Sequence, residues 1–273
     1  MVNAYIKLLR LDVCLLAVLG LIVGGLVSGL GIPIPFYFLA AWVVVFLVCG
    51  GGNVINDYYD YGTDKVNKTH RPLPSGQITM KGAKFYGWLL LLFGNIIAFA
   101  FFTPLATVFV IINTVIVWLY SFKLKRTPIG HLVDSWLAAS PFILAGILFS
   151  NLNTSLIILA VISFFGNMGR EIVKGIEDMK GDSYTGMKTF EIYLGKWKAM
   201  WVTIISILLA VVLSFVPYIY GKMDLVYLII IILADFIFVY SLSQIKKPNY
   251  CQKIMKLGMF VAMAAFLIGT ILI

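Results

Sequence analysis

Long apolar runs, separated by short polar stretches, occupy most of the chain from residue 11 onward. A hydrocarbon core of about 30 Å needs roughly 20 apolar residues in a helix that crosses it. Nine runs meet this length, near residues 11–30, 36–56, 85–102, 105–122, 132–150, 154–174, 199–219, 225–243 and 256–273. The sequence lacks the alternating segments of about ten residues that are typical of membrane β-barrels. The pattern therefore predicts an all-α bundle of nine transmembrane helices.

Composition narrows this interpretation to one membrane domain. Of the 273 residues, 61% are hydrophobic and 12% are charged, and the mean hydropathy is +0.98, which is far from the values of soluble domains. We expect a single intramembrane domain over residues 1–273, in contact with the bilayer and without nucleic acid as a partner. The first apolar run exceeds the core of about 7–15 residues found in signal peptides, so it should remain as the first span.

The basic residues predict the orientation. Twenty of the 21 Lys and Arg residues fall in the N-terminal tail or in connections on one side of the predicted bundle, and Lys222 alone lies opposite. Lys and Arg accumulate in cytoplasmic loops. We therefore expect a multi-pass protein of the cell membrane, with the N-terminus and the charged loops in the cytoplasm.

Acidic residues concentrate in two short stretches, each of which ends an apolar run. Seven of the twelve Asp and Glu residues lie within residues 53–64 and 170–182. Ionisable groups at the membrane are costly and usually functional. Because both stretches fall on the predicted cytoplasmic side, they are candidates for one shared site.

The first stretch places oxygen donors along one face, provided that the second span continues as a helix to its cytoplasmic end. At positions i, i+3, i+4, i+7 and i+11 this face carries Asn53, Asn56, Asp57, Asp60 and Asp64. Carboxylates combined with water and substrate phosphate are the ligands that Mg²⁺ prefers. A solvated acidic helix end is the alternative, but it explains five aligned positions poorly.

The second stretch repeats this geometry. Glu171, Lys174, Asp178 and Asp182 share a helical face, with Glu177 one position away from it. Two interpretations of Lys174 stay open. It forms an ordinary ion pair with a carboxylate one turn away, or it binds a phosphate beside the metal.

A basic loop follows the first acidic stretch and contains Arg71-Pro-Leu-Pro-Ser-Gly76. The two prolines restrict the backbone, and a guanidinium held there is suited to bidentate binding of phosphate. The lysines of the loop are explained equally by membrane orientation. His70 is a candidate metal ligand, although we favour a hydrogen bond within the loop.

Together these motifs resemble the UbiA-type intramembrane prenyltransferase superfamily, and the resemblance extends over essentially the whole chain. It rests on Asn56-Asp57-x-x-Asp60-x-x-x-Asp64, the Arg-Pro-Leu-Pro loop and Asp178-x-x-x-Asp182. A transporter would not require two such clusters and this loop on the same membrane face. Members of the superfamily have nine helices around a central cavity, with the acidic motifs facing each other at its mouth.

The resemblance implies Mg²⁺-dependent transfer of an isoprenoid from its diphosphate to an acceptor. By motif position, Asn56, Asp60 and Asp64 would serve one Mg²⁺, and Asp178 and Asp182 the other, so the four aspartates are the expected catalytic groups. The residues expected to bind substrate are Asn53, Asp57, Arg71, Lys125, Glu171 and Lys174.

Residues 170–182 are most similar to an archaeal branch of the superfamily. Those enzymes transfer a geranylgeranyl group from geranylgeranyl diphosphate to the free hydroxyl of geranylgeranylglyceryl phosphate, which forms the second ether bond of archaeal lipids. The alternative is an aromatic acceptor such as a quinone precursor or a porphyrin. A prenyl diphosphate and a lipid phosphate as partners predict further cations near the mouth, and the candidates are Lys7, Arg10, Lys123, Lys125 and Arg126.

Other polar residues stay outside the predicted site. The role of His131, where superfamily members often have Asn, is left open. We expect Asp134 to be solvated and the deeper Asp235 to pair with a neighbouring helix. The three cysteines, which lack metal-ligand spacing, are interpreted as packing residues, namely Cys14, Cys49 and Cys251.

Overall fold

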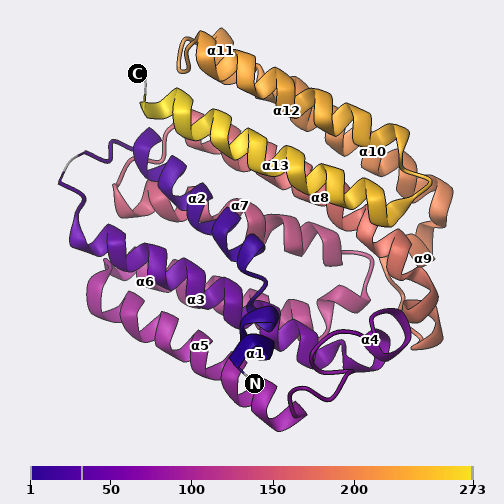
Figure 1. Ribbon diagram of the computed structural model, residues 1–273. Coiled ribbons are helices and arrows are strands. Elements are labelled where there is room, and N and C mark those ends of the chain that lie inside the picture. The colour runs from indigo at the N-terminus through magenta and orange to yellow at the C-terminus, as the bar shows by residue number, and fades with distance from the viewer. Residues whose placement is uncertain (1, 32, 272–273) are drawn as a thin grey trace.

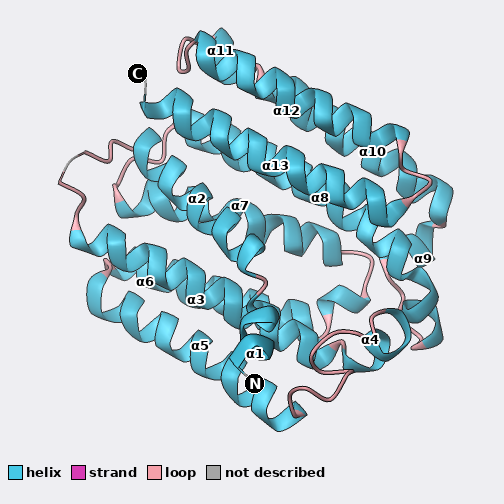
Figure 2. Ribbon diagram, in the orientation of Figure 1, coloured by secondary structure: helices cyan, strands magenta, loops and turns pink. Residues whose placement is uncertain are grey.

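The computed structural model describes residues 2–31 and 33–271, and within these ranges every regular element is helical (Figures 1 and 2). The elements are α1 (Val2–Leu9), α2 (Leu11–Val27), α3 (Phe36–Tyr59), α4 (Tyr61–Asn67), α5 (Met80–Phe101), α6 (Pro104–Phe122), η1 (Leu124–Arg126), α7 (Gly130–Leu148), α8 (Thr154–Tyr184), α9 (Phe190–Leu194), α10 (Lys196–Ser214), α11 (Val216–Ile219), α12 (Leu225–Ser243) and α13 (Pro248–Ile271). The predicted all-α class is confirmed.

Eight of the described helical segments are long and apolar enough to cross a membrane, with α10 and α11 counted as one segment, and α2 is a shorter apolar helix of 17 residues. Each of these nine segments overlaps one of the nine predicted runs, in the same order. The last two residues of the ninth run, 272–273, lie outside the described residues.

Several predicted boundaries are wrong at the end that carries the charged loops. Helix α5 begins at Met80, α8 continues to Tyr184 and α13 begins at Pro248, each well outside the predicted run. Hydropathy marks only the apolar part of a helix, whereas these helices extend past it. At the start of α5 the Thr79 hydroxyl accepts a hydrogen bond from the Gly82 amide at 3.1 Å, which caps the helix earlier than the apolar pattern indicates.

Small residues allow the central helix α3 to lie close against α5. A Cβ atom added at Gly87 of α5 would stand 2.8 Å from the Ile55 side chain, and one added at Gly51 of α3 would stand 2.9 Å from Leu91. Close backbone approach at small residues is the usual way in which helices pack within lipid. The position of α3, and of the first acidic motif at its end, is fixed by this contact.

The two short helices α4 and α9 lie at the same end of the bundle, at the right of Figure 1, whereas α11 lies at the opposite end. The end that carries α4 and α9 also holds both acidic motifs, since α4 continues the first motif and α9 follows the second. We call this end the mouth.

Candidate active site

The first motif surrounds a break between α3 and α4. Asp60 has backbone angles of φ −82° and ψ 0°, so the continuous helix that the shared face required is interrupted at this residue. The break is slight, because the Asp60 amide still donates to the Asn56 carbonyl at 2.9 Å and its carbonyl accepts from the Asp64 amide at 2.8 Å. Asp57, Asp60 and Asp64 therefore remain together at the mouth, and all three are buried.

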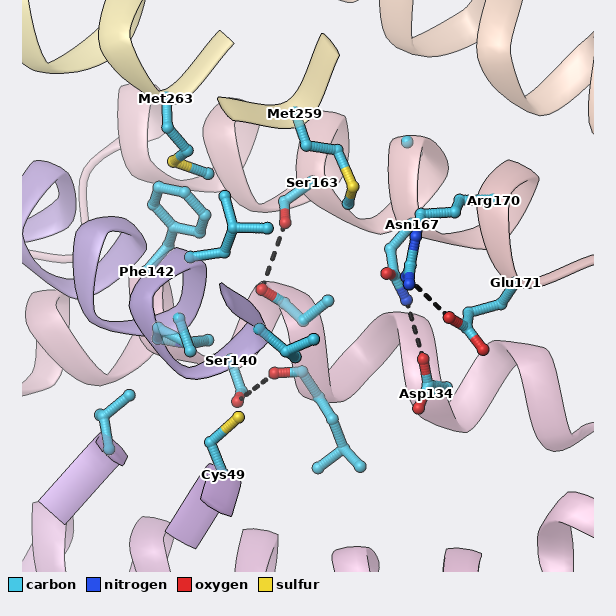
Figure 3. Close-up of a pocket in the computed structure, with 18 of the residues that line it drawn as sticks. Cys49, Asp134, Ser140, Phe142, Ser163, Asn167, Arg170, Glu171, Met259 and Met263 are labelled. Atoms are coloured by element: carbon cyan, nitrogen blue, oxygen red, sulfur yellow. Dashed lines mark hydrogen bonds and ion pairs between the residues drawn. The ribbon is translucent and has the colours of Figure 1, made fainter. Parts of the chain in front are cut away.

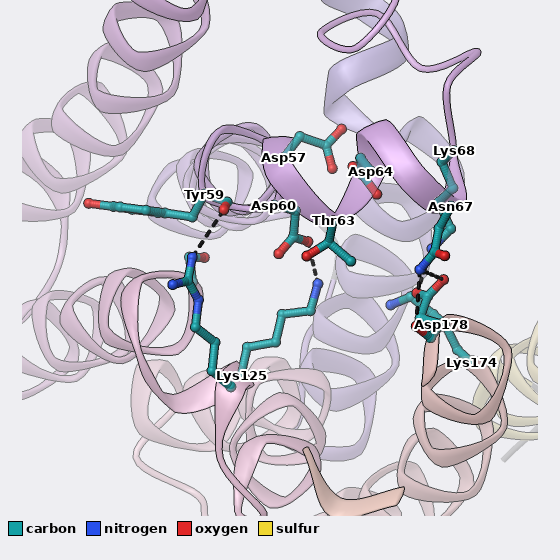
Figure 4. A network of polar contacts seen from close by, with 12 residues as sticks. Asp57, Tyr59, Asp60, Thr63, Asp64, Asn67, Lys68, Lys125, Lys174 and Asp178 are labelled. Carbon is teal, nitrogen blue, oxygen red and sulfur yellow. Dashed lines mark hydrogen bonds and ion pairs between the residues drawn. The ribbon is translucent and has the colours of Figure 1, made fainter. Parts of the chain in front are cut away.

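Cations from three other segments neutralise these aspartates. Arg71 Nη1 lies 2.7 Å from Asp64 Oδ2 and 3.1 Å from Asp57 Oδ1. Arg10 also pairs with Asp57, and Lys125 of η1 pairs with Asp60, as Figure 4 shows for the latter. The predicted candidates Arg71, Arg10 and Lys125 thus meet at the first motif.

Arg10 occupies an unusual backbone conformation. Its φ of 53° and ψ of 66° place it in the left-handed region between α1 and α2, which costs on the order of 1–3 kcal/mol for a residue other than glycine. The pairing with Asp57 holds the side chain in the mouth. Such strain is typical of residues that are positioned for function.

Burial and nearby cations shift the pKa of the aspartates in opposite directions. Burial disfavours ionisation of Asp60, but Lys125, Arg10 and Arg71 together outweigh it, so the pKa of Asp60 lies below its ordinary value. For Asp64 burial is the larger effect, and it raises the pKa of this carboxyl despite the nearby Arg71 guanidinium. Neighbouring carboxylates therefore differ in how readily they ionise.

The second motif faces the first across the mouth, as the resemblance implied. Lys68 Nζ lies 2.5 Å from Asp178 Oδ2, and Asn67 Nδ2 donates to the Asp178 carbonyl at 3.0 Å (Figure 4). Gly181 makes room for this contact, because a Cβ atom there would stand 2.4 Å from Asn67 Nδ2. Asp182 is buried beside it. Residues more than 100 positions apart in the sequence therefore form one site.

Two turns before Asp178 on α8, Glu171 holds two cations. Its Oε1 accepts from Arg170 Nη1 at 2.7 Å and its Oε2 accepts from Lys174 Nζ at 2.6 Å. The ion-pair interpretation of Lys174 is therefore confirmed, and the pair does not exclude a contact with substrate. Arg170 was not among the predicted site residues.

A cavity of about 260 Å³ extends from the mouth into the bundle. Its polar end includes Asn53, Asn56, Arg10, Asp134, Arg170, Glu171 and Lys174, and its deeper walls are largely apolar, with Phe142, Leu159, Ile231 and Phe266 among them. In Figure 3 the polar side chains Asp134, Asn167, Arg170 and Glu171 lie together at one side of the view, and Phe142 and Met263 lie at the other. The Asn53 amide is also used within the protein, since Nδ2 donates to the Leu9 carbonyl at 2.9 Å.

For the polar residues outside the predicted site, some expectations are confirmed and others are wrong. Asp235 accepts a hydrogen bond from Ser214 of α10 at 2.8 Å, so its predicted pairing with a neighbouring helix is confirmed. Asp134 is not solvated by cytosol but faces the cavity, because α7 turns this side toward α8. Cys14 and Cys251 are buried as predicted, whereas Cys49 lines the cavity.

Of the basic residues predicted to lie near the mouth, some reach it and others do not. Arg10 and Lys125 reach the mouth, but Lys7, Lys123 and Arg126 are exposed and do not line the cavity. His70 is exposed in its loop.

Sequence reasoning missed a second buried pair. His131 pairs with the fully buried Glu191 of α9 beside the second motif. The carboxylate packs against Gly175 of α8, where a Cβ atom would stand 2.2 Å away. No spacing pattern links His131 to a residue 60 positions further along the chain.

The carboxylates at the mouth fit Mg²⁺ in type, but Asp60, Asp64 and Asp178 are paired with Lys or Arg in this structure. Within residues 2–31 and 33–271, no three His, Cys, Asp or Glu side chains converge on a point that could hold a metal ion. Mg²⁺ needs only one or two carboxylates when substrate phosphate and water complete its shell. Asp60, Asp64, Asp178 and Asp182 supply such carboxylates from both sides, provided that Lys and Arg exchange partners.

The fold and this mouth define an intramembrane enzyme for a substrate with an apolar tail and an anionic head. Residues 17–264 match the UbiA prenyltransferase family. The chain belongs to this family, and it is a multi-pass membrane prenyltransferase.

Individual relatives are similar over nearly their full lengths. The digeranylgeranylglyceryl phosphate synthase of Methanococcus aeolicus is 35% identical over 279 residues, with 99% of each chain covered. A solved structure of a digeranylgeranylglyceryl phosphate synthase is 34% identical, with a TM-score of 0.75 and coverage of 100% of this chain and 99% of that one. A UbiA homologue from Archaeoglobus fulgidus bound to GPP and Mg²⁺ is 17% identical, with a TM-score of 0.64 and coverage of 96% and 99%, which shows a shared fold.

Proposed function

We propose that this protein transfers a geranylgeranyl group from geranylgeranyl diphosphate to the free hydroxyl of geranylgeranylglyceryl phosphate, with Mg²⁺ as cofactor. The product carries the second ether bond of an archaeal membrane lipid. The full-length relatives named for this synthesis support the lipid acceptor over an aromatic one.

The observation that carries the proposal is the meeting of two largely buried aspartate motifs beside the polar end of a largely apolar cavity. A long prenyl chain is accommodated by the apolar walls, while its diphosphate remains at the charged mouth. When bound, Mg²⁺ would neutralise the departing diphosphate and so favour cleavage of its bond to the prenyl carbon. Asn56, Asp60 and Asp64 would hold one ion, and Asp178 and Asp182 the other.

The chain's own cations would bind and orient the diphosphate. Arg71 presents a planar guanidinium to Asp57 and Asp64 and so stands where a phosphate would arrive with its metal. Lys125 and Lys68 each contact an aspartate of a different motif and therefore flank the same position. The apolar walls exclude water, which protects the reacting allylic carbon from hydrolysis.

We further propose that the protein resides in the cell membrane with its mouth on the cytoplasmic side. The support is the basic residues, which collect in the connections at that end. Both substrates would then meet at the inner surface, where water-soluble Mg²⁺ is available.

The test is a reconstitution of the purified protein with Mg²⁺ and geranylgeranyl diphosphate. One sample contains geranylgeranylglyceryl phosphate and a parallel sample contains 4-hydroxybenzoate, and mass spectrometry identifies the products. We expect an ether product from the lipid acceptor and release of one diphosphate for each ether formed. Exclusive prenylation of the aromatic ring would replace the lipid acceptor but keep the family reaction.

A further inference from the structure

One carboxylate at the polar end of the cavity differs from the others. Asp134 of α7 lines the cavity, and its Oδ2 accepts a hydrogen bond from Asn167 Nδ2 of α8 at 3.0 Å (Figure 3). Of the other acids that line this cavity, Glu171 is paired with two cations and Asp235 lies deeper with Ser214. Across the described part of the chain, Asp134 forms no ion pair.

A cation with unused donors stands next to it. Arg170 Nη1 donates a hydrogen bond to Glu171, but the buried Nε of Arg170 has no hydrogen-bond partner among the described residues. A guanidinium has five N–H donors, so one carboxylate contact leaves several for an anion. Lys174 is held to the other oxygen of Glu171, which keeps two cations together on one wall. Two positive charges and one negative charge give this wall a net positive charge.

Asp134 and the cationic wall lie on the facing helices α7 and α8, and Asn167 joins them. Asn167 reaches Asp134 from α8, and Arg170 follows Asn167 by one helical turn on the same helix. A carboxylate that can accept a proton and a cationic wall are thus side by side (Figure 3). A glycerol phosphate requires this combination, because its hydroxyl and its phosphate belong to one three-carbon unit.

We propose that Asp134, Asn167, Arg170 and Lys174 form the binding site for the acceptor head group. Arg170 and Lys174 bind its phosphate, Asn167 orients Asp134, and Asp134 accepts the proton of the reacting hydroxyl. This inference rests on the proposed function, because it assigns the acceptor of that reaction to particular side chains.

The step balances without a further reactant. The hydroxyl oxygen forms a bond to C1 of the prenyl chain, while the bond from C1 to the diphosphate oxygen breaks and the electron pair leaves with the diphosphate. The hydroxyl proton passes to an oxygen of Asp134 and then to solvent at the mouth. Asp134 is therefore a catalytic residue in this proposal, and Asn167 is a positioning residue.

The first experiment separates proton transfer from binding. Asp134→Asn keeps the shape and the contact surface but removes the base, so kcat should fall on the order of 10²–10⁴-fold, the range for a general base. The acceptor KM should change little, and Asp134→Glu should restore part of the rate. Calorimetry with non-hydrolysable geranylgeranyl thiolodiphosphate should show unchanged donor binding.

A matched control is Glu177→Gln, which makes the same carboxylate-to-amide change on α8 outside the cavity, where Glu177 contacts Asn249 and Gln252. Its kcat should stay near the wild-type value. Wild-type kcat in Asp134→Asn would overturn the assignment of the base.

The second experiment tests the phosphate contact by changing the residue and the acceptor together. With geranylgeranylglyceryl phosphate, Arg170→Gln should raise the acceptor KM about 10–100-fold, as expected when a charge-assisted contact is lost. With the dephosphorylated alcohol, wild type and variant should have the same KM, because the group that Arg170 binds is missing. Lys180→Gln, an exposed cation on the same helix, is the control.

The outcomes distinguish this inference from the proposed function. Equal losses in Arg170→Gln with both acceptors would assign Arg170 a structural role and overturn the phosphate contact. An active wild type with unaffected variants would remove the head-group site and leave the proposed function in place. A wild type that does not use geranylgeranylglyceryl phosphate would overturn both.

Discussion

The two sides of the mouth compensate their charges in different ways. The first motif lies at a break between two helices, and its aspartates are paired with Arg10, Arg71 and Lys125 from three separate segments. The second lies on the unbroken 31-residue helix α8, and Asp178 depends on Lys68 from the opposite side. Both motifs therefore depend on cations from other segments, but the first gathers three of them, whereas Asp178 of the second pairs with Lys68 alone.

The largest expected effect comes from deleting one aspartate on each side. Asp60→Ala and Asp178→Ala should each lower turnover on the order of 10²–10⁴-fold, because charge on the departing diphosphate is no longer balanced. Asp60→Ala should also lower Tm more, because both substitutions break an ion pair but the Asp60 side chain is 6% exposed and that of Asp178 is 14% exposed. Near-normal turnover of both variants at saturating Mg²⁺ would contradict the two-metal assignment.

Substitutions of Arg71, which pairs with two aspartates of the first motif, should have a smaller effect. Arg71→Lys keeps the charge but loses the planar fork, so the donor KM should rise about tenfold, and further in Arg71→Ala. Steady-state kinetics with varied geranylgeranyl diphosphate measures this change. Lys81→Gln, an exposed cation at the start of α5, is the control. Unaltered donor KM in both Arg71 variants would reduce the residue to an orientation signal.

The smallest effect is expected from a substitution that weakens the contact between the two sides of the mouth. In Gly181→Ala the new Cβ would meet Asn67 Nδ2 at 2.4 Å and push it away from Asp178. We expect a stability loss of about 1–3 kcal/mol from this overpacking, measured by thermal unfolding in detergent.

Gly62→Ala on α4 is the matched comparison, because its Cβ would meet no atom within 4 Å. Alanine also has the higher helix propensity, so this variant should keep or slightly raise Tm. Equal Tm values for the two alanine variants would show that the contact with Asn67 does not stabilise the assembled mouth.

The apolar pattern predicted the number and order of the long helices, because the membrane requires about 20 apolar residues in each span. It could not predict where α8 ends, since that helix continues for ten residues past the predicted run at 174. The continuation is stabilised by contacts from α4, such as those of Asn67 and Lys68 with Asp178. Those contacts join residues far apart in the sequence.

Spacing predicted which aspartates would lie together, and the proline-containing loop singled out Arg71, but the other cationic partners could not be told from unrelated basic residues. Arg10 and Lys125 were named as candidates by charge alone, but the same argument also named Lys7, Lys123 and Arg126, which are exposed. Asp134 was set aside because an isolated acid has no spacing to interpret. Its importance depends on the direction in which α7 turns it, and that direction is set by packing against α8.

The cations that occupy the mouth have a consequence for the order in which ligands bind. In the proposed two-metal site, Arg71 and Lys125 would compete with a metal ion for Asp64 and Asp60, so the metal alone would have to displace them. A diphosphate attracts the same cations and thereby frees the carboxylates. Donor and metal then assist each other, and thermodynamic reciprocity requires each to strengthen the binding of the other by the same factor. On the proposed assignment, the mouth would therefore bind metal ion and donor together rather than either one alone.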